Sequence, residues 1–111
     1  MPEPNPSAKL DAIRSHTAMG AEDALALSRL IRPLLAGRDP QLVLGALADL
    51  VSIGIAGHVV PGDPQATARL RGTILGLHVA YLIDLIPASA GEILGETGLP
   101  VDLAPLRLAI A

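Results

Sequence analysis

Asp49 is the polar residue whose position carries the clearest chemical meaning, because it lies in the middle of an aliphatic run. A carboxylate that leaves water needs a partner. If the chain forms an antiparallel hairpin that turns near residues 58–63, Asp49 lies near residue 72 and within reach of Arg69 or Arg71. We therefore predict a buried or half-buried ion pair that fixes the register of the two helices. The alternative is a polar contact of Asp49 with a ligand or a protein partner.

A second carboxylate, Asp84, lies towards the far end of the next apolar stretch. The helix dipole disfavours a negative charge at that end, so we predict a surface or interhelix salt bridge to a nearby arginine. A turn at residues 37–39 would also give Asp49 the alternative neighbours Ser28 and Arg29. The hairpin that turns near residues 58–63 brings Asp84 towards Arg38, or towards Arg32 and Gly37.

Two histidines are candidates for proton transfer or metal binding. His58 follows Gly57 at the predicted turn, where capping of its own helix explains it. His78 lies seven residues after Arg71 and three before Tyr81, so these three side chains share one helix face. We predict a polar cluster there, at a partly exposed rim or in the core, with a ligand pocket as the alternative. The candidate ligand or partner contacts are Asp49, Arg69, Arg71, His78 and Tyr81.

The sequence contains no motif for enzymatic chemistry. A metal site needs three or four ligands at definite spacing, and no His-x-x-x-His, Glu-x-x-His or Asp-x-Asp series is present. The serines lack a Gly-x-Ser-x-Gly elbow, and the glycines form neither a dinucleotide-binding fingerprint nor a P-loop. Without cysteine, disulfides and thiol chemistry are excluded. We predict that the chain is no enzyme and has no catalytic, cofactor-binding or metal-binding residues.

Charge and composition limit the partners. The net charge of −3 and the single aromatic residue, Tyr81, provide neither the basic surface nor the stacking rings that nucleic acids require. Residues 42–60 are very apolar, but Asp49 interrupts them and no Lys/Arg cluster or aromatic belt flanks them, which argues against a membrane span. The acidic, proline-rich start lacks the segments of a secretory signal, so we predict a cytoplasmic protein.

The apolar spacing and the abundance of leucine and alanine predict an all-α fold. Asp39-Pro40 and Asp63-Pro64 each combine an N-cap acid with proline at the first helical position. We therefore predict a small helical bundle built on a long antiparallel hairpin, with helices at about residues 40–57 and 64–86. Pro87 is expected to end the second helix, because proline lacks the backbone donor.

A further helix at about residues 21–36 is predicted to pack across the hairpin, and a short helix capped by Ser7 should run through about His16. The helix at residues 21–36 has an apolar stripe, because its apolar residues are spaced three and four apart. These residues are Ala24, Leu27, Ile31, Leu34 and Leu35.

Three segments are expected along the chain: an extended, proline-rich N-terminal arm at residues 1–6, a helical domain at 7–87, and a C-terminal segment at 88–111 that docks on the core or on a neighbour. The run from Ser89 to Glu92 matches a capping box and predicts a separate turn. A short helix is expected from Ala104.

The two hairpin helices carry little polar surface, and one small domain can hardly cover them. Gly72, Gly76 and Ala80, spaced four apart, indicate either a tight crossing within the chain or an oligomer seam. We predict a homodimer or higher oligomer, which acts as a non-enzymatic protein–protein interaction or assembly module and joins itself or a larger assembly. The alternative is a small-molecule-binding helical protein with a pocket between helices or at a dimer seam.

Overall fold

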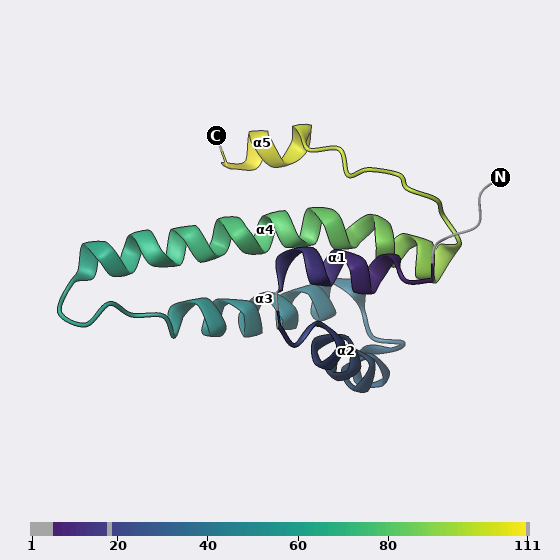
Figure 1. The fold of residues 1–111 in the computed structure, drawn as a ribbon, viewed down its shortest axis with the longest axis horizontal. Helices are drawn as coiled ribbons and strands as arrows, with labels where there is room; N and C mark the ends of the chain where they lie inside the picture. The colour runs from purple at the N-terminus through teal and green to yellow at the C-terminus, as the bar shows by residue number, and fades with distance from the viewer. Residues whose placement is uncertain (1–5, 18, 111) are drawn as a thin grey trace. The chain divides into compact units, whose positions relative to one another are not determined.

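The computed structural model describes residues 6–17 and 19–110, and every regular element within these ranges is an α-helix. The prediction of an all-α fold is therefore confirmed. The predicted N-terminal arm lies outside the described residues, except for Pro6, which belongs to a turn. The described helices are α1 (Ala8–His16), α2 (Ala21–Leu35), α3 (Pro40–Ala56), α4 (Pro64–Leu94) and α5 (Ala104–Ile110), as Figure 1 shows.

The helices belong to two compact units. The unit Asp23–Val79, here called the hairpin unit, contains most of α2, all of α3 and the first half of α4. The other, called the terminal unit, consists of Met1–Glu22 and Ala80–Ala111, and contains α1, the second half of α4 and α5. The helix α4 is continuous through both.

In the hairpin unit, α3 and α4 run antiparallel and are joined by residues 57–63 (Figure 1). The Asp39 carboxylate accepts a hydrogen bond of 2.7 Å from the Gln41 amide. The Asp63 carboxylate accepts one of 2.9 Å from the Ala66 amide. Both acids precede a proline, whose missing donor costs nothing at the first helical position. The predicted Asp-Pro helix starts are confirmed.

The predicted end of the second hairpin helix at Ile86 is wrong, because α4 continues through Pro87 to Leu94. An internal proline removes one backbone hydrogen bond but does not force the helix to stop. Here α1 contacts the helix on both sides of the proline, through Lys9 with Glu92 and His16 with Asp84, and these contacts favour a continuous helix. The predicted turn starting at Ser89 is therefore also wrong, since Ser89 and Glu92 lie in the last turns of α4.

In the terminal unit, α1 runs antiparallel to the second half of α4 (Figure 1). Two pairs of side chains mark the ends of this contact: Lys9 with Glu92 and His16 with Asp84. Between them, Ile13 is 5% exposed. The predicted short helix up to His16 is confirmed, although the Ser7 side chain forms no cap hydrogen bond at its start.

The helix α2 extends from Ala21 to Leu35 and passes through Pro33, close to the predicted range. It is followed by Gly37, whose positive φ of 74° completes the turn towards α3. The apolar stripe predicted for this helix does not form the buried side of α2. Leu25 is buried instead, whereas Leu27 and Leu34 of that stripe are exposed.

Few side chains of the described residues are withdrawn from water. The outer leucines of α3 show this most clearly: Leu42 and Leu50 are 60% and 62% exposed. A soluble helix normally buries its apolar stripe. The helices of the described chain thus leave apolar surface uncovered. The buried residues among those described are Ile13, Ala21, Leu25 and Thr67.

Candidate functional site

The loop end of the hairpin is organised around Thr67, a residue that the sequence analysis did not single out. Its hydroxyl oxygen accepts a 2.9 Å hydrogen bond from the Val60 amide and donates to the Asp63 carbonyl, also at 2.9 Å. The side chain is almost fully buried. This role could have been predicted from the sequence, because Thr67 lies four residues after the Asp63 cap, and at that spacing a threonine can bond back to a helix carbonyl. Thr67 therefore joins the loop to the start of α4.

Arg71 binds the other side of the same loop. Its Nη2 donates to the Ala56 carbonyl at 2.7 Å and its Nε donates to the His58 carbonyl at 3.2 Å. A cation at the free carbonyls of a helix C-terminus stabilises that end. The Nδ1 atom of His58 lies 2.9 Å from the Gly54 carbonyl, so the prediction that His58 caps its own helix is confirmed.

The predicted ion pair of Asp49 is not formed within the described chain. The Asp49 side chain is exposed, and no salt bridge among the described residues includes it. The predicted hairpin places opposite one another residues whose numbers add up to about 121. Thr67 bonds Val60 and Arg71 bonds Ala56, and each of these pairs adds up to 127. Each residue of α3 therefore faces a residue of α4 about six positions further along than predicted. Asp49 keeps its carboxylate in water, and its contact with a ligand or partner stays a prediction.

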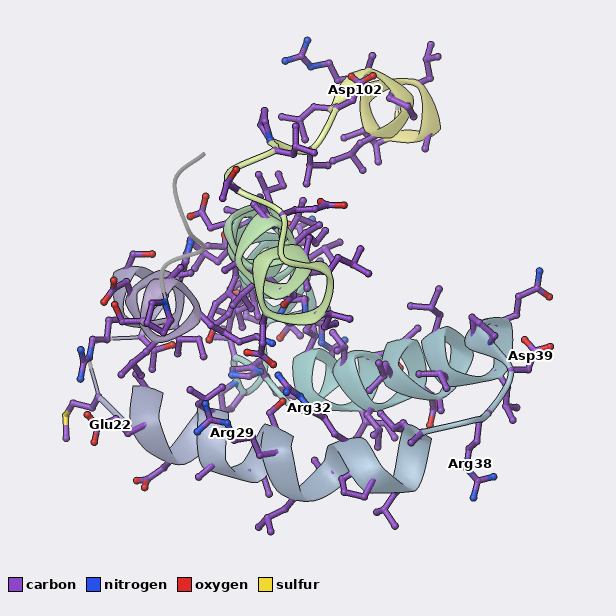
Figure 2. All side chains as sticks on the ribbon, turned by 90° about the vertical axis from the view of Figure 1, so that its right-hand side faces the viewer. Glu22, Arg29, Arg32, Arg38, Asp39 and Asp102 are labelled. Carbon is purple, nitrogen blue, oxygen red and sulfur yellow. The ribbon has the colours of Figure 1, made fainter. Side chains whose placement is uncertain are left out.

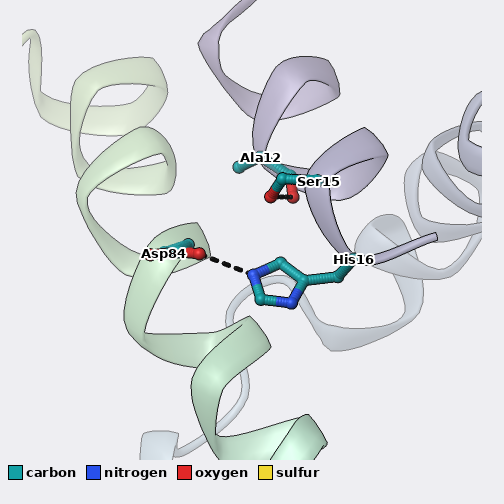
Figure 3. A network of polar contacts seen from close by, with 4 residues as sticks. All are labelled: Ala12, Ser15, His16 and Asp84. Carbon is teal, nitrogen blue, oxygen red and sulfur yellow. Dashed lines mark hydrogen bonds and ion pairs between the residues drawn. The ribbon is translucent and has the colours of Figure 1, made fainter.

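Asp84 is paired with a histidine and not with the arginine that was predicted. Its Oδ2 lies 2.5 Å from Nε2 of His16, as Figure 3 shows. His16 is 18% exposed in its side chain and Asp84 54%. The His16 ring also lies 4.9 Å from the ring of Tyr81, measured between centroids. Sequence reasoning missed His16 because nothing in the chain around it indicates which part of the molecule α1 contacts.

A histidine beside a carboxylate is an arrangement that can also activate a nucleophile. The neighbouring hydroxyl is that of Ser15, which donates to the Ala12 carbonyl at 2.8 Å (Figure 3). The Ser15 proton is therefore engaged with backbone, and the geometry does not align the hydroxyl with His16. The pair of His16 and Asp84 serves to hold α1 on α4.

Two further ion pairs fix α1. Lys9 Nζ lies 3.5 Å from Glu92 Oε2, with both side chains mostly shielded from water. Arg14 Nη2 lies 2.7 Å from Glu22 Oε1, and this pair is exposed. The first connects α1 to the end of α4, and the second connects it to the first turn of α2. The terminal unit thus has polar contacts at both ends of α1.

The residues predicted to form a ligand site do not gather into one. Arg71 binds carbonyls at the end of α3, whereas Tyr81 packs against His16 in the other unit. Arg69 is exposed, and His78 is half-buried on α4. Within residues 6–17 and 19–110, no group of three His, Asp or Glu side chains could hold a metal ion. In the same ranges, no buried side-chain polar atom lacks a hydrogen-bond partner.

The small residues of α4 do not mediate a close helix crossing within the chain. Gly72, Gly76 and Ala80 are exposed, and a Cβ atom added at either glycine would meet no atom within 4 Å. The prediction of a tight intrachain crossing at these residues is wrong. The alternative, an oligomer seam, stays a prediction.

The surface that stands out is apolar. Large aliphatic side chains are exposed along α2 and α3, and α4 adds Leu75 and Leu77. By length and composition alone, α4 could cross a membrane, and none of its most apolar 18-residue stretch is buried. These faces are the candidate functional surface. On α2 and α3 its members are Leu27, Leu30, Ile31, Leu34, Leu42, Leu44, Leu47, Leu50 and Ile53.

Comparison with protein-family models, with curated proteins and with solved structures finds no match to this chain. Inference about its function therefore depends on its own residues and their geometry.

Proposed function

We propose that this chain is a non-enzymatic assembly module that associates with copies of itself, and with a larger assembly, through apolar helix faces. The observation that supports the proposal is the exposure of the large aliphatic side chains on α2 and α3. Contiguous apolar surface of this kind on a soluble chain typically marks an interaction site.

The energies favour a contact that uses more than one helix. Burying a Leu or Ile side chain completely contributes about 1.5–3 kcal/mol, so covering one that is already partly shielded contributes about 1 kcal/mol. Both copies bury their surface in a symmetric contact, so the four large side chains of the α2 surface contribute about 8 kcal/mol per dimer, and the five of α3 about 10 kcal/mol more. Association costs about 4–15 kcal/mol in lost freedom. A contact through α2 alone is therefore of the same size as this cost, whereas a contact that also uses α3 exceeds it.

The proposal includes the predicted bundle, in which α2 packs across the α3–α4 hairpin, and the docking of the C-terminal segment. In α5 the apolar residues Leu108 and Ile110 are exposed. Such a segment gains from contact with its own core or with a neighbouring chain. The cytoplasmic location predicted from the sequence belongs to the same proposal.

Insertion into a membrane is the main competing explanation for the apolar exposure of α4. Two observations argue against it. Asp49 is an exposed carboxylate in the middle of α3, the antiparallel neighbour that would enter the bilayer with α4, and a charge at the centre of a bilayer costs about 3 kcal/mol even on the most lenient scale. In addition, α1 places Lys9 and His16 against the second half of α4, where a spanning helix would meet lipid.

Small-molecule binding is less supported than assembly. Two of the side chains predicted to line a pocket, Arg71 and Tyr81, already contact groups of the chain itself.

The test is the molar mass in solution, measured by light scattering and sedimentation over a range of concentrations. We expect a mass of two or more chains. The mass should persist at about 1 M salt, where exposed charges are screened but apolar contacts are not. A monomer at every concentration would contradict the proposal. Flotation with lipid vesicles, measured in parallel, would instead favour membrane insertion.

A further inference from the structure

The helix α2 has two distinct apolar sides. One carries Leu25, which is 6% exposed. On the other side, Leu27, Leu30 and Leu34 are 58%, 74% and 67% exposed, with Ile31 beside them. Their spacing of three and four residues places them in one line along the helix, as in the seam of a coiled coil. This exposed line, from Asp23 to Arg38, is here called the α2 stripe.

The two ends of the α2 stripe carry opposite charges. Asp23 lies on the same helix face as Leu27 and is exposed, with no ion pair among the described residues. Arg38 follows the last turn of α2, is exposed, and donates from Nε to the Leu34 carbonyl at 2.7 Å. That bond holds the guanidinium against the end of the helix and leaves both Nη groups for another partner.

The other charges of α2 lie off the α2 stripe. Figure 2 shows Arg29 and Arg32 pointing to one side of the helix, whereas Arg38 lies beyond its end. Glu22 is paired with Arg14. The α2 stripe is therefore acidic at its start, aliphatic along its length and basic at its end.

We propose that the α2 stripe binds the same stripe of a second copy in antiparallel orientation. The inference depends on the proposed self-association and identifies one contact through which it occurs. A two-fold axis between residues 30 and 31 places Leu27 against Leu34 of the other copy, and Asp23 against Arg38. A stripe with opposite charges at its ends complements itself only when reversed, as an isologous interface requires. A parallel pair would place like charges together at both ends.

Engineered cysteines test the orientation, because the native chain has none. Leu27→Cys and Leu34→Cys are made separately, oxidised alone, and then oxidised as an equimolar mixture. The antiparallel pairing predicts little cross-linking of either variant alone and a mixed disulfide between them. Self-linking of each variant, with no preference for the mixed product, would overturn the orientation.

Charge reversal tests the ends of the α2 stripe. Asp23→Lys and Arg38→Glu should each weaken dimerisation about threefold to tenfold at low salt, since each removes two exposed ion pairs per dimer. The double variant should restore the native dissociation constant, because its pairs are re-formed with their signs exchanged. The matched control is Arg29→Glu, an exposed charge of α2 that lies off the stripe and should leave the constant unchanged. Equal weakening by this control and no rescue by the double variant would overturn the pairing.

A pair of leucine variants separates this inference from the proposed function. Leu30→Glu should weaken association at least about tenfold, since it places a carboxylate beside the axis. Leu44→Glu changes a similarly exposed leucine of α3. If Leu44→Glu dissociates the assembly and Leu30→Glu does not, the α2 contact is wrong although self-association stands. If the native chain is a monomer throughout, both proposals fail.

Discussion

The terminal unit and the hairpin unit use polar contacts in different ways. In the terminal unit, ion pairs at Lys9 and His16 lie at opposite ends of α1, and Ile13 is buried between them. In the hairpin unit, the polar contacts are concentrated at the loop, where Thr67 and Arg71 bind backbone groups. The outer faces of its helices carry exposed leucines.

This difference shows how a short polar helix can cover one side of a longer apolar one. The helix α1 supplies charges and the buried Ile13 to one side of the second half of α4, whereas Leu82, Ile86, Ile93 and Leu94 of the same stretch stay exposed. The loop contacts of the hairpin unit fix only a local turn, and they leave α2 and α3 available for another chain.

The largest effect is expected from Ile13→Ala, which removes the buried side chain between the ion pairs of α1. Loss of a buried aliphatic group should lower the free energy of unfolding by about 2–4 kcal/mol, measured by urea titration followed by circular dichroism. The matched control is Leu99→Ala in the same unit, whose side chain is exposed and should contribute little. Equal losses for both variants would mean that α1 does not depend on Ile13.

Thr67→Val should lower the free energy of unfolding by about 1–3 kcal/mol, because the Val60 amide loses its partner in a shielded site. Amide hydrogen exchange at Val60 should accelerate as well. Thr73→Val is the control, since Thr73 only bonds back to Arg69 on an exposed face of α4. If the two variants unfold alike, Thr67 does not hold the loop.

Arg71→Met keeps the aliphatic part of the side chain but removes the donors to the Ala56 and His58 carbonyls. We expect a loss of about 1 kcal/mol and faster amide exchange in the last turn of α3. Arg69→Met is the control, because Arg69 is exposed on the same helix. An effect at Arg69 as large as that at Arg71 would exclude a specific capping role.

The smallest effect is expected for the pair of His16 and Asp84. Because Asp84 is half exposed, a double-mutant cycle with His16→Gln and Asp84→Asn should give a coupling energy of about 0.2–1 kcal/mol. Asp49→Asn should leave stability unchanged, because that carboxylate has no salt bridge in the described chain. A coupling energy of zero would show that the pair of His16 and Asp84 does not hold α1 on α4.

Local signals in the sequence predicted local features well. Asp39 and Asp63 start their helices as predicted, and His58 bonds back to Gly54. Each of these contacts joins residues within four positions, so short-range backbone geometry is sufficient to specify it. The end of α4 was not predictable in this way, because its continuation past Pro87 accompanies a contact with distant α1.

The sequence by itself determined that the chain is helical, where α3 and α4 begin, and that their faces are strongly apolar. Only the tertiary structure decided which polar residues meet: His16 binds Asp84 across 68 positions of the chain, while Asp49 remains in water. The physical reason is that helix propensity and capping act within one or two turns. A pairing between distant helices depends instead on which faces pack together, and two nearly uniform aliphatic helices specify that choice poorly.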